Sequence, residues 1–166
     1  MSEVRIHYSV AGEVQLERAF TRLAIDVKDF TLPLRASEEV IEQSTRRQFA
    51  QQGQPAWKKL KPTYAARKAR LHPGKTILRA TDALYNSLVR AGSPGAIREV
   101  TATQLRFGTS LEVNGWNLGL IHQMGRKDKT LPARPMLRLS STSKRLIVDC
   151  FVDYFRSIAA KRGVPA

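Results

Sequence analysis

The side chains that could carry out chemistry are few and lie far apart in the chain. His122 is the best candidate general base, because an imidazole titrates near neutral pH, yet no serine, cysteine or acid close to it in sequence completes a triad. Asp149 and Asp153 are four residues apart on a predicted helix, but their basic neighbours on that helix favour solvated ion pairs. We therefore expect a protein that is not an enzyme, with a hydrolase that uses His122 as the weaker alternative.

Nucleotide and metal sites are no better indicated. Gly74-Lys75-Thr76 matches the end of a phosphate-binding loop, but the first glycine of that loop would fall at Ala69, and no predicted strand precedes it. The three histidines lack zinc-site spacing, and the single cysteine, Cys150, falls in an apolar helical pattern typical of a core residue. The sequence predicts no nucleotide, cofactor or metal.

Charge is the most uneven property of the sequence. The chain has 166 residues and a formal net charge of +14. Between Gln43 and Thr81 there is no Asp or Glu but there are ten Lys and Arg, so this window supplies most of the excess positive charge. Such an asymmetry predicts a polyanionic partner, either nucleic acid or an acidic protein surface. The side chains expected to contact DNA or an acidic partner are Lys58, Lys59, Lys61, Lys68, Arg70 and Lys75.

These residues must be positioned by the helices and strands that the apolar pattern predicts. At this length the chain fits a single domain, residues 1–166, and residues 53–80 hold few large apolar side chains, which predicts an extended basic arm. Ser37 and Thr81 are the expected N-caps of the helices that flank the arm. The expected elements are a strand over 3–9, helices over 16–30, from Ser37 to Gly53, over 62–71 and from Thr81 to Gly92, a hairpin over 96–110, a short helix over 116–124, a strand over 135–139 and a long helix from Ser141 or Thr142.

The order of these elements predicts an α+β fold, with helices packed on a small, mainly antiparallel sheet and with a projecting basic arm. The apolar stripe of the last helix is expected to pack on that sheet. No apolar run approaches the roughly 20 residues that cross a bilayer, and the N-terminus lacks the layout of a secretory signal. We expect a protein that is synthesised in the cytoplasm and has no membrane partner.

Three segments share their order and spacing with one known family. Residues 49–68 contain a phenylalanine, a glycine, Pro-x-Trp, Leu-x-Pro-Thr and then a basic helix, and residues 78–88 lead from a Leu-Arg pair into the next helix. An HQxG motif at 122–125 is followed by an ARPxL motif at 133–137. Together these segments resemble the phage virion morphogenesis (tail-completion) family, which includes the tail-completion proteins of Mu-like and P2-like phages.

The resemblance implies a structural role in a tailed-phage particle and no catalysis. It implies a tail-completion, tail-terminator or neck subunit that forms a ring at the head–tail junction, around the channel through which DNA passes. Six subunits are expected, because tail tubes in related assemblies are six-fold, and the implied partners are further copies of the chain and tail-tube, sheath or head-connector proteins. The implied location is the virion, in the tail or neck, after assembly in the host cytoplasm. A DNA-binding accessory protein of packaging or assembly is the alternative.

The motif residues have expected roles at subunit interfaces. Trp57, Leu60 and Tyr64 are the expected anchors of the arm, because aromatic side chains dominate interface energies. Arg134 is expected to donate paired hydrogen bonds to a carboxylate or to carbonyl groups of a neighbouring subunit. Pro135 is expected to begin an edge or interface strand. The full set of expected interface residues is Trp57, Leu60, Tyr64, Arg67, His122, Gln123, Arg134 and Pro135.

The HQxG and ARPxL motifs also have a predicted role inside the subunit. His122 and Gln123 carry donors and acceptors suited to holding a loop against backbone, and Gly125 would permit a positive φ. The alternative to an interface role is that these motif residues only stabilise the monomer.

Overall fold

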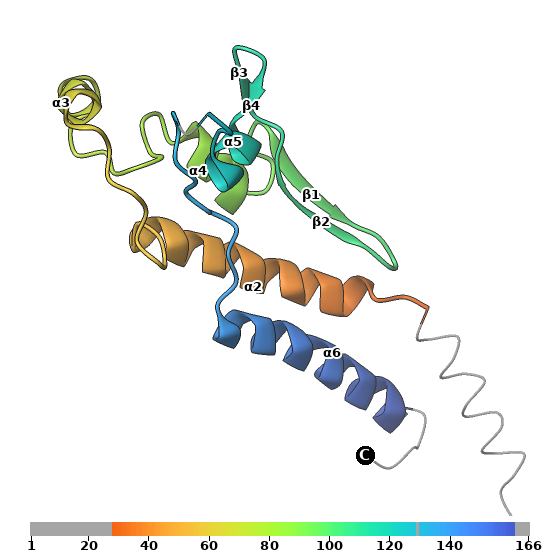
Figure 1. The fold of residues 1–166 in the computed structure, drawn as a ribbon. Helices are drawn as coiled ribbons and strands as arrows, with labels where there is room; N and C mark the ends of the chain where they lie inside the picture. The colour runs from red at the N-terminus through yellow and green to blue at the C-terminus, as the bar shows by residue number, and fades with distance from the viewer. Residues whose placement is uncertain (1–27, 129, 162–166) are drawn as a thin grey trace, which may run out of the picture.

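The computed structural model describes residues 28–128 and 130–161. The expected strand over 3–9 and most of the expected helix over 16–30 lie outside these ranges. The described part combines helices with two small antiparallel sheets, which confirms the α+β fold class (Figure 1). Its elements are α2 (Thr31–Ala50), α3 (Pro62–Leu71), α4 (Ala83–Val89), β1 (Ala96–Val100), β2 (Leu105–Thr109), β3 (Glu112–Val113), β4 (Trp116–Asn117), α5 (Leu118–Met124) and α6 (Ser141–Lys161).

Helix α2 begins six residues before the expected start, and the prediction of Ser37 as its N-cap is wrong. The Ser37 hydroxyl lies inside the helix and donates to the carbonyl of Pro33 at 2.7 Å. Pro33 is tolerated because it lies in the first turn, where a backbone N–H has no helical acceptor. The amide of Thr31 instead donates to the Asp29 carboxylate at 2.8 Å.

Helix α6 begins at Ser141 as expected, but the prediction that it packs on a sheet is wrong. It lies antiparallel along α2, which forms a central layer between α6 and the part that contains the hairpins, α4 and α5 (Figure 1). Phe30, just before α2, places its ring 6.0 Å from that of Phe151 and 6.2 Å from that of Phe155. The apolar stripe therefore identified a face that packs on another element, although Leu146 and Phe155 remain 41% exposed, but it did not identify that element.

The expected hairpin is confirmed and lies on the opposite side of α2. Strand β1 pairs antiparallel with β2, with Ala96 opposite Thr109 and Val100 opposite Leu105. Helix α4 packs on this hairpin and on α2. The buried core between them consists of Phe49, Trp57, Leu84, Leu88, Val89 and Met136.

The region after the hairpin differs from prediction in one element. A second, very short hairpin, β3–β4, leads into α5, which begins at Leu118 within the expected helix. Residues 135–139 do not form the expected strand. The side-chain amide of Gln123 forms hydrogen bonds with the backbone of Met136 and Leu137, so a side chain supplies the partners that a neighbouring strand would have supplied.

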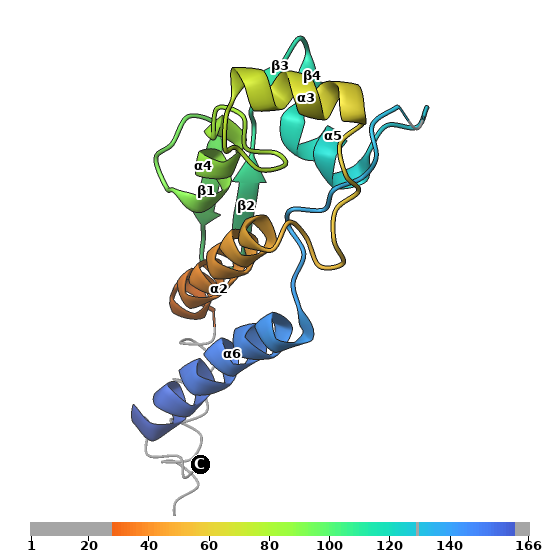
Figure 2. The same cartoon turned by 90° about the vertical axis from the view of Figure 1, so that its left-hand side faces the viewer.

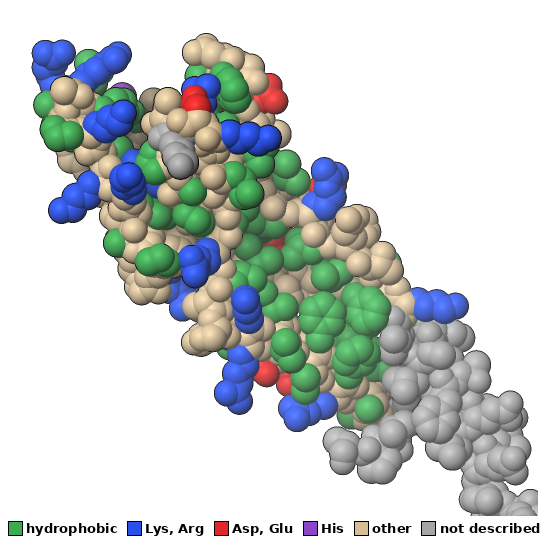
Figure 3. All heavy atoms as spheres, in the orientation of Figure 1, with side chains coloured by type: hydrophobic (Ala, Val, Ile, Leu, Met, Phe, Trp, Pro, Cys, Tyr) green, Lys and Arg blue, Asp and Glu red, His purple; other side chains and the backbone are tan. Residues whose placement is uncertain are grey.

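The basic arm, residues 53–80, carries α3 to one end of the described molecule (Figures 1 and 2). Proline at the first position of α3 suits a helix start, because that position needs no N–H acceptor. In the same view, basic side chains surround this end of the surface (Figure 3). No helix among residues 28–128 and 130–161 is long and apolar enough to cross a membrane.

Candidate functional site

The HQxG and ARPxL motifs meet in space and bind each other's backbone. The amide of Arg134 donates to the carbonyl of His122 at 2.7 Å. Gln123 Oε1 accepts from the amides of Met136 at 2.9 Å and Leu137 at 3.1 Å, and Nε2 donates to the carbonyl of Leu137 at 3.2 Å. The predicted loop-holding role of Gln123 is thus seen directly.

Gly125 closes the same loop, and its predicted positive φ is confirmed at +74°. A Cβ at this position would lie 2.7 Å from the backbone nitrogen of Ala133 and 2.9 Å from the carbonyl oxygen of Leu131. Both contacts are with backbone atoms, which cannot rotate away as a flexible side chain can. Glycine is required here for space as well as for conformation.

Trp57 joins the first motif to the last. Its indole nitrogen donates to the carbonyl of Pro135 at 3.0 Å, and its ring meets that of Phe49 edge-on at 5.4 Å. Only 6% of Trp57 is exposed, whereas Tyr64, farther along the arm, is 52% exposed. The structure therefore places Trp57 in the core of the subunit, and Tyr64 is the aromatic residue that the arm presents outward. Pro135, expected to begin a strand, instead supplies the acceptor for Trp57.

Beneath the arm lies a pocket of about 520 Å³. Its walls come from the arm, from residues 77–84, from α5 and from residues 130–134. This volume lies within the range of about 300–1,000 Å³ that is usual for ligand sites. The apolar residues of its lining include Leu60, Ile77, Leu78, Leu84, Leu118 and Leu131.

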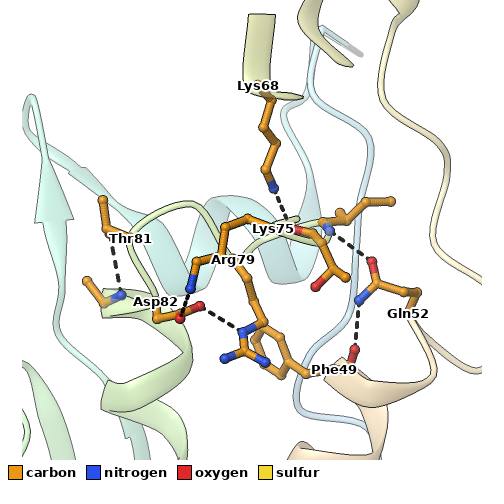
Figure 4. Close-up of polar contacts among 10 residues, drawn as sticks. Phe49, Gln52, Lys68, Lys75, Arg79, Thr81 and Asp82 are labelled. Carbon is orange, nitrogen blue, oxygen red and sulfur yellow. Dashed lines mark hydrogen bonds and ion pairs between the residues drawn. The ribbon is translucent and has the colours of Figure 1, made fainter. Parts of the chain in front are cut away.

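The charged side chains of this pocket are cationic except for Asp82, and two of the cationic ones are buried. Arg134 is 4% exposed and Lys68 is 7% exposed. The Nε of Arg134 donates to the carbonyl of Lys58 at 3.1 Å, and within the described residues its two Nη nitrogens have no hydrogen-bond partner. The Nζ of Lys68 donates to the carbonyl of Thr76 (Figure 4). Burial lowers the pKa of both groups.

His122 lines the pocket next to Arg134. Its Nδ1 is buried and has no hydrogen-bond partner among the residues that the structure describes. Burial lowers the pKa of this imidazole, and the positive charge of Arg134 lowers it further. His122 is therefore neutral near pH 7 and has no hydroxyl, thiol or carboxylate bound to its Nδ1.

One carboxylate, Asp82, lines the pocket and is already neutralised. It accepts from Arg79 Nε at 2.7 Å and from Lys75 Nζ at 2.6 Å (Figure 4). These bonds, to Arg79 first and Lys75 second, lower its pKa to about 2. Asp82 occupies the N-cap position of α4, so the prediction of Thr81 as that N-cap is wrong, although the Thr81 hydroxyl accepts from the amide of Ala83 at 3.4 Å.

The loop that carries Asp82 is tied to α2 by Gln52. Gln52 Oε1 accepts from the amide of Ile77 at 2.9 Å, and Nε2 donates to the carbonyl of Phe49 at 2.7 Å (Figure 4). Neither Asp82 nor Gln52 was singled out from the sequence. Asp82 is the first acid after the acid-free window, and this was the available signal that it neutralises bases of the arm.

The candidate polyanion contacts divide into three groups. Lys68 is buried and Lys75 is paired with Asp82, so neither presents a free charge outward. The remaining four have exposed side chains and no ion pair in the described part of the chain, and they are Lys58, Lys59, Lys61 and Arg70. Arg67, expected at a subunit interface, is exposed and unpaired in the same way.

Comparison with known proteins gives one decisive match. The model of the phage virion morphogenesis family matches residues 13–156, which include every motif of the site. The chain belongs to the phage virion morphogenesis family. This family membership assigns the chain a role in phage virion morphogenesis. No curated protein and no solved structure matches the chain in the corresponding comparisons.

Proposed function

We propose that the chain is a structural subunit of a tailed-phage particle, a tail-completion or neck protein that forms a ring at the head–tail junction. Membership of the phage virion morphogenesis family supports a structural role. The observation that carries the proposal is the basic arm, which Trp57 fixes to the core while α3 presents Tyr64 and unpaired cations at one end of the subunit (Figure 2). An arm that is anchored in the core at Trp57 and exposed along α3 suits a contact with another subunit.

The pocket beneath the arm supports construction in preference to catalysis. A nucleophile activated by a histidine needs its hydroxyl or thiol within hydrogen-bond reach of the imidazole. Nδ1 of His122 has no such neighbour among the described residues, and Asp82 is held by two cations. The protein is therefore proposed to turn over no substrate.

A closed ring needs two different and complementary patches on each subunit. We expect six subunits, in line with the six-fold tail tubes of related assemblies, and contacts with tail-tube, sheath or head-connector proteins. The arm supplies one patch through Tyr64, Arg67 and Arg70, which are exposed on α3. In this proposal the protein resides in the tail or neck of the virion.

The experiment substitutes exposed residues of α3 in the full chain. Tyr64→Ser, Arg67→Gln and Arg70→Gln together are expected to abolish rings in light scattering and negative-stain images, because they remove the outward contact. The midpoint of thermal unfolding should stay within a few degrees of that of the wild type, since surface changes typically alter stability by less than about 0.5 kcal/mol. Deleting residues 54–75 is less informative, because it would remove the buried Trp57.

The matched control is Lys144→Gln with Arg145→Gln, which removes the same number of charges from exposed positions on α6. Rings should persist in this control. Rings of normal size in the α3 variant would contradict the role of the arm, and a wild-type chain that stays monomeric both alone and with phage tails would contradict the ring.

A DNA-binding accessory protein is the second candidate, and the unpaired cations of the arm favour it. Lys58, Lys59 and Lys61 lie close together in sequence and are exposed, as a groove that follows a phosphate backbone requires. This candidate predicts that the arm, more than other basic parts of the surface, determines how DNA affinity depends on salt.

A further inference from the structure

The pocket beneath the arm has positive charge that the subunit itself does not neutralise. Asp82 is the one carboxylate in its described lining and is already bound by Arg79 and Lys75. The Nη nitrogens of the buried Arg134 are left without a partner in the described chain. These two nitrogens are not among the fully buried polar atoms that lack a partner, so they are accessible from the pocket, and a carboxylate that enters it would form charge-assisted hydrogen bonds with them.

The shape of the pocket favours a protein segment over nucleic acid. A backbone phosphate is flanked by sugars on both sides, whereas a carboxylate at the end of a side chain can reach a recessed guanidinium by itself. Arg134 is only 4% exposed, so its partner must reach inward. Other residues of the lining, Leu60, Ile77 and Leu118, are apolar and would be covered by apolar side chains of the same segment.

The β3–β4 hairpin has the complementary properties. Val113 and Trp116 are cross-strand partners on one face and are 51% and 50% exposed. Glu112 is exposed on the other face, opposite Asn117, because successive side chains of a strand alternate. Glu112 is the one charged residue between Ser110 and Leu118, so the hairpin is acidic in a basic protein.

The hairpin leaves the pocket of its own subunit free. None of residues 112–117 is among the residues that line it. In Figure 1 the hairpin projects above α5, apart from α3, whose Tyr64 and Lys68 line the pocket. The one aromatic contact of Trp116 in the described structure is with Arg126, whose guanidinium lies 4.7 Å from the ring centre. The hairpin is therefore available to a second subunit.

We propose that the β3–β4 hairpin of one copy docks in the pocket of the next copy, with Glu112 bound by Arg134 and with Val113 and Trp116 against the leucine-rich wall. This inference rests on the proposed ring, and it extends the arm patch proposed above into the pocket, whose lining includes Tyr64. Pocket and hairpin are different surfaces, so the contact is heterologous and each subunit keeps one free pocket and one free hairpin for the next. An exposed tryptophan that enters an apolar pocket is a typical hot spot.

The test mixes two complementary variants of the full chain. The hairpin variant carries Glu112→Lys and Trp116→Ser, both at exposed positions. The pocket variant carries Arg134→Gln. Because Arg134 is buried and this variant could fail to fold, a second pocket variant carries Lys58→Glu and Lys61→Glu, which change only exposed residues of the lining. Each variant alone is expected to be monomeric in light scattering. An equimolar mixture should form a discrete dimer, because one intact hairpin meets one intact pocket and growth then stops.

Several outcomes would overturn the inference. Glu99→Lys, the same charge change at an exposed site on β1, is the control and should leave assembly unchanged. If the wild type and the hairpin variant both form normal rings, the hairpin contact is rejected, while the proposal of a ring is unaffected.

If the wild type forms no ring, a cyclised peptide that copies residues 110–118 still tests the pocket. The hairpin variant is the target, because its own pocket is unchanged. The peptide with the natural Glu112 should bind it at least about tenfold more tightly than the same peptide with Glu112→Gln, and equal affinities of the two peptides would reject the inference.

Discussion

Gln123 and Arg134 belong to neighbouring motifs but use their polar atoms differently. Gln123 Oε1 has both lone pairs engaged by backbone amides, so this side chain holds residues 136–137 in place. Arg134 has only its Nε engaged, and its remaining donors face the pocket. The motif residues thus divide between one that maintains the fold and one that remains free to bind.

The titrating groups of the pocket predict how stability depends on pH. The pKa of His122 is lowered in the folded state, so below its ordinary value of 6.5 the unfolded chain binds a proton that the folded chain does not. Stability is therefore expected to fall as the pH drops below about 6.5. A second loss is expected between 3.8 and about 2, where Asp82 is protonated and its bonds to Arg79 and Lys75 weaken.

Thermal unfolding measured from pH 8 to about pH 2 checks both steps. His122→Gln should remove the first step, since glutamine does not titrate. Asp82→Asn should lower stability at pH 7 by about 1–2 kcal/mol, a modest effect because the carboxylate is partly exposed, and should flatten the onset of the acid step. An unchanged first step in His122→Gln would show that another group controls it.

At the scale of elements, one buried ion pair joins the hairpin to the central helix. Arg98 on β1 lies 3.3 Å from Glu38 on α2, and the two side chains are 8% and 19% exposed. The guanidinium also lies over the ring of Phe107, 3.6 Å from its centre, and donates to the carbonyl of Leu88 on α4. Three elements are thus held by one side chain.

Glu38→Gln should therefore destabilise the fold by about 2 kcal/mol, because it leaves the Arg98 charge buried without a carboxylate. Glu39→Gln is the matched control, an exposed acid on the same helix, and should change stability by less than about 0.5 kcal/mol. Urea unfolding measures both. Equal effects would mean that the Arg98–Glu38 pair does not hold the hairpin to α2.

Local patterns predicted the types of most described elements, and long-range contacts decided the rest. The start of α2 could not be read from Ser37, because a serine before two acids suits both an N-cap and a helix interior. The position of α2 is fixed by distant contacts, including those of Phe30 with Phe151 on α6. The segment 135–139 has a strand-like sequence, but side chains bind its backbone: Gln123 at Met136 and Leu137, Trp57 at Pro135, and Ser44 and Gln48 at Arg138. No strand of the described chain pairs with it.

The site was predictable in part. The resemblance located His122, Gln123 and Arg134, but no local pattern could show that their neighbours enclose a pocket. Its apolar wall combines Leu60 and Leu118 with residues 77–84 and 130–134, segments far apart in the chain. Only folding brings them together, which is why sequence reasoning placed Trp57 at an interface and missed the pocket beside it.

For the whole molecule, the open issue is whether the positive charge of the arm serves a protein or DNA. Any strongly basic protein binds DNA at low salt, and each phosphate contact adds about 0.9 to the slope of log affinity against log salt. The informative comparison is between two triple variants. The arm variant carries Lys58→Gln, Lys59→Gln and Lys61→Gln, and the α6 variant carries Lys144→Gln, Arg145→Gln and Lys161→Gln. All six side chains are exposed.

If the arm is a docking element for another subunit, the two triple variants should reduce the salt slope equally, because both remove three surface charges from a general field. Ring assembly should then be impaired only in the arm variant. A slope that falls by about 3 in the arm variant and stays unchanged in the α6 variant would place DNA along the arm. Fluorescence anisotropy with a random duplex at several salt concentrations distinguishes these outcomes.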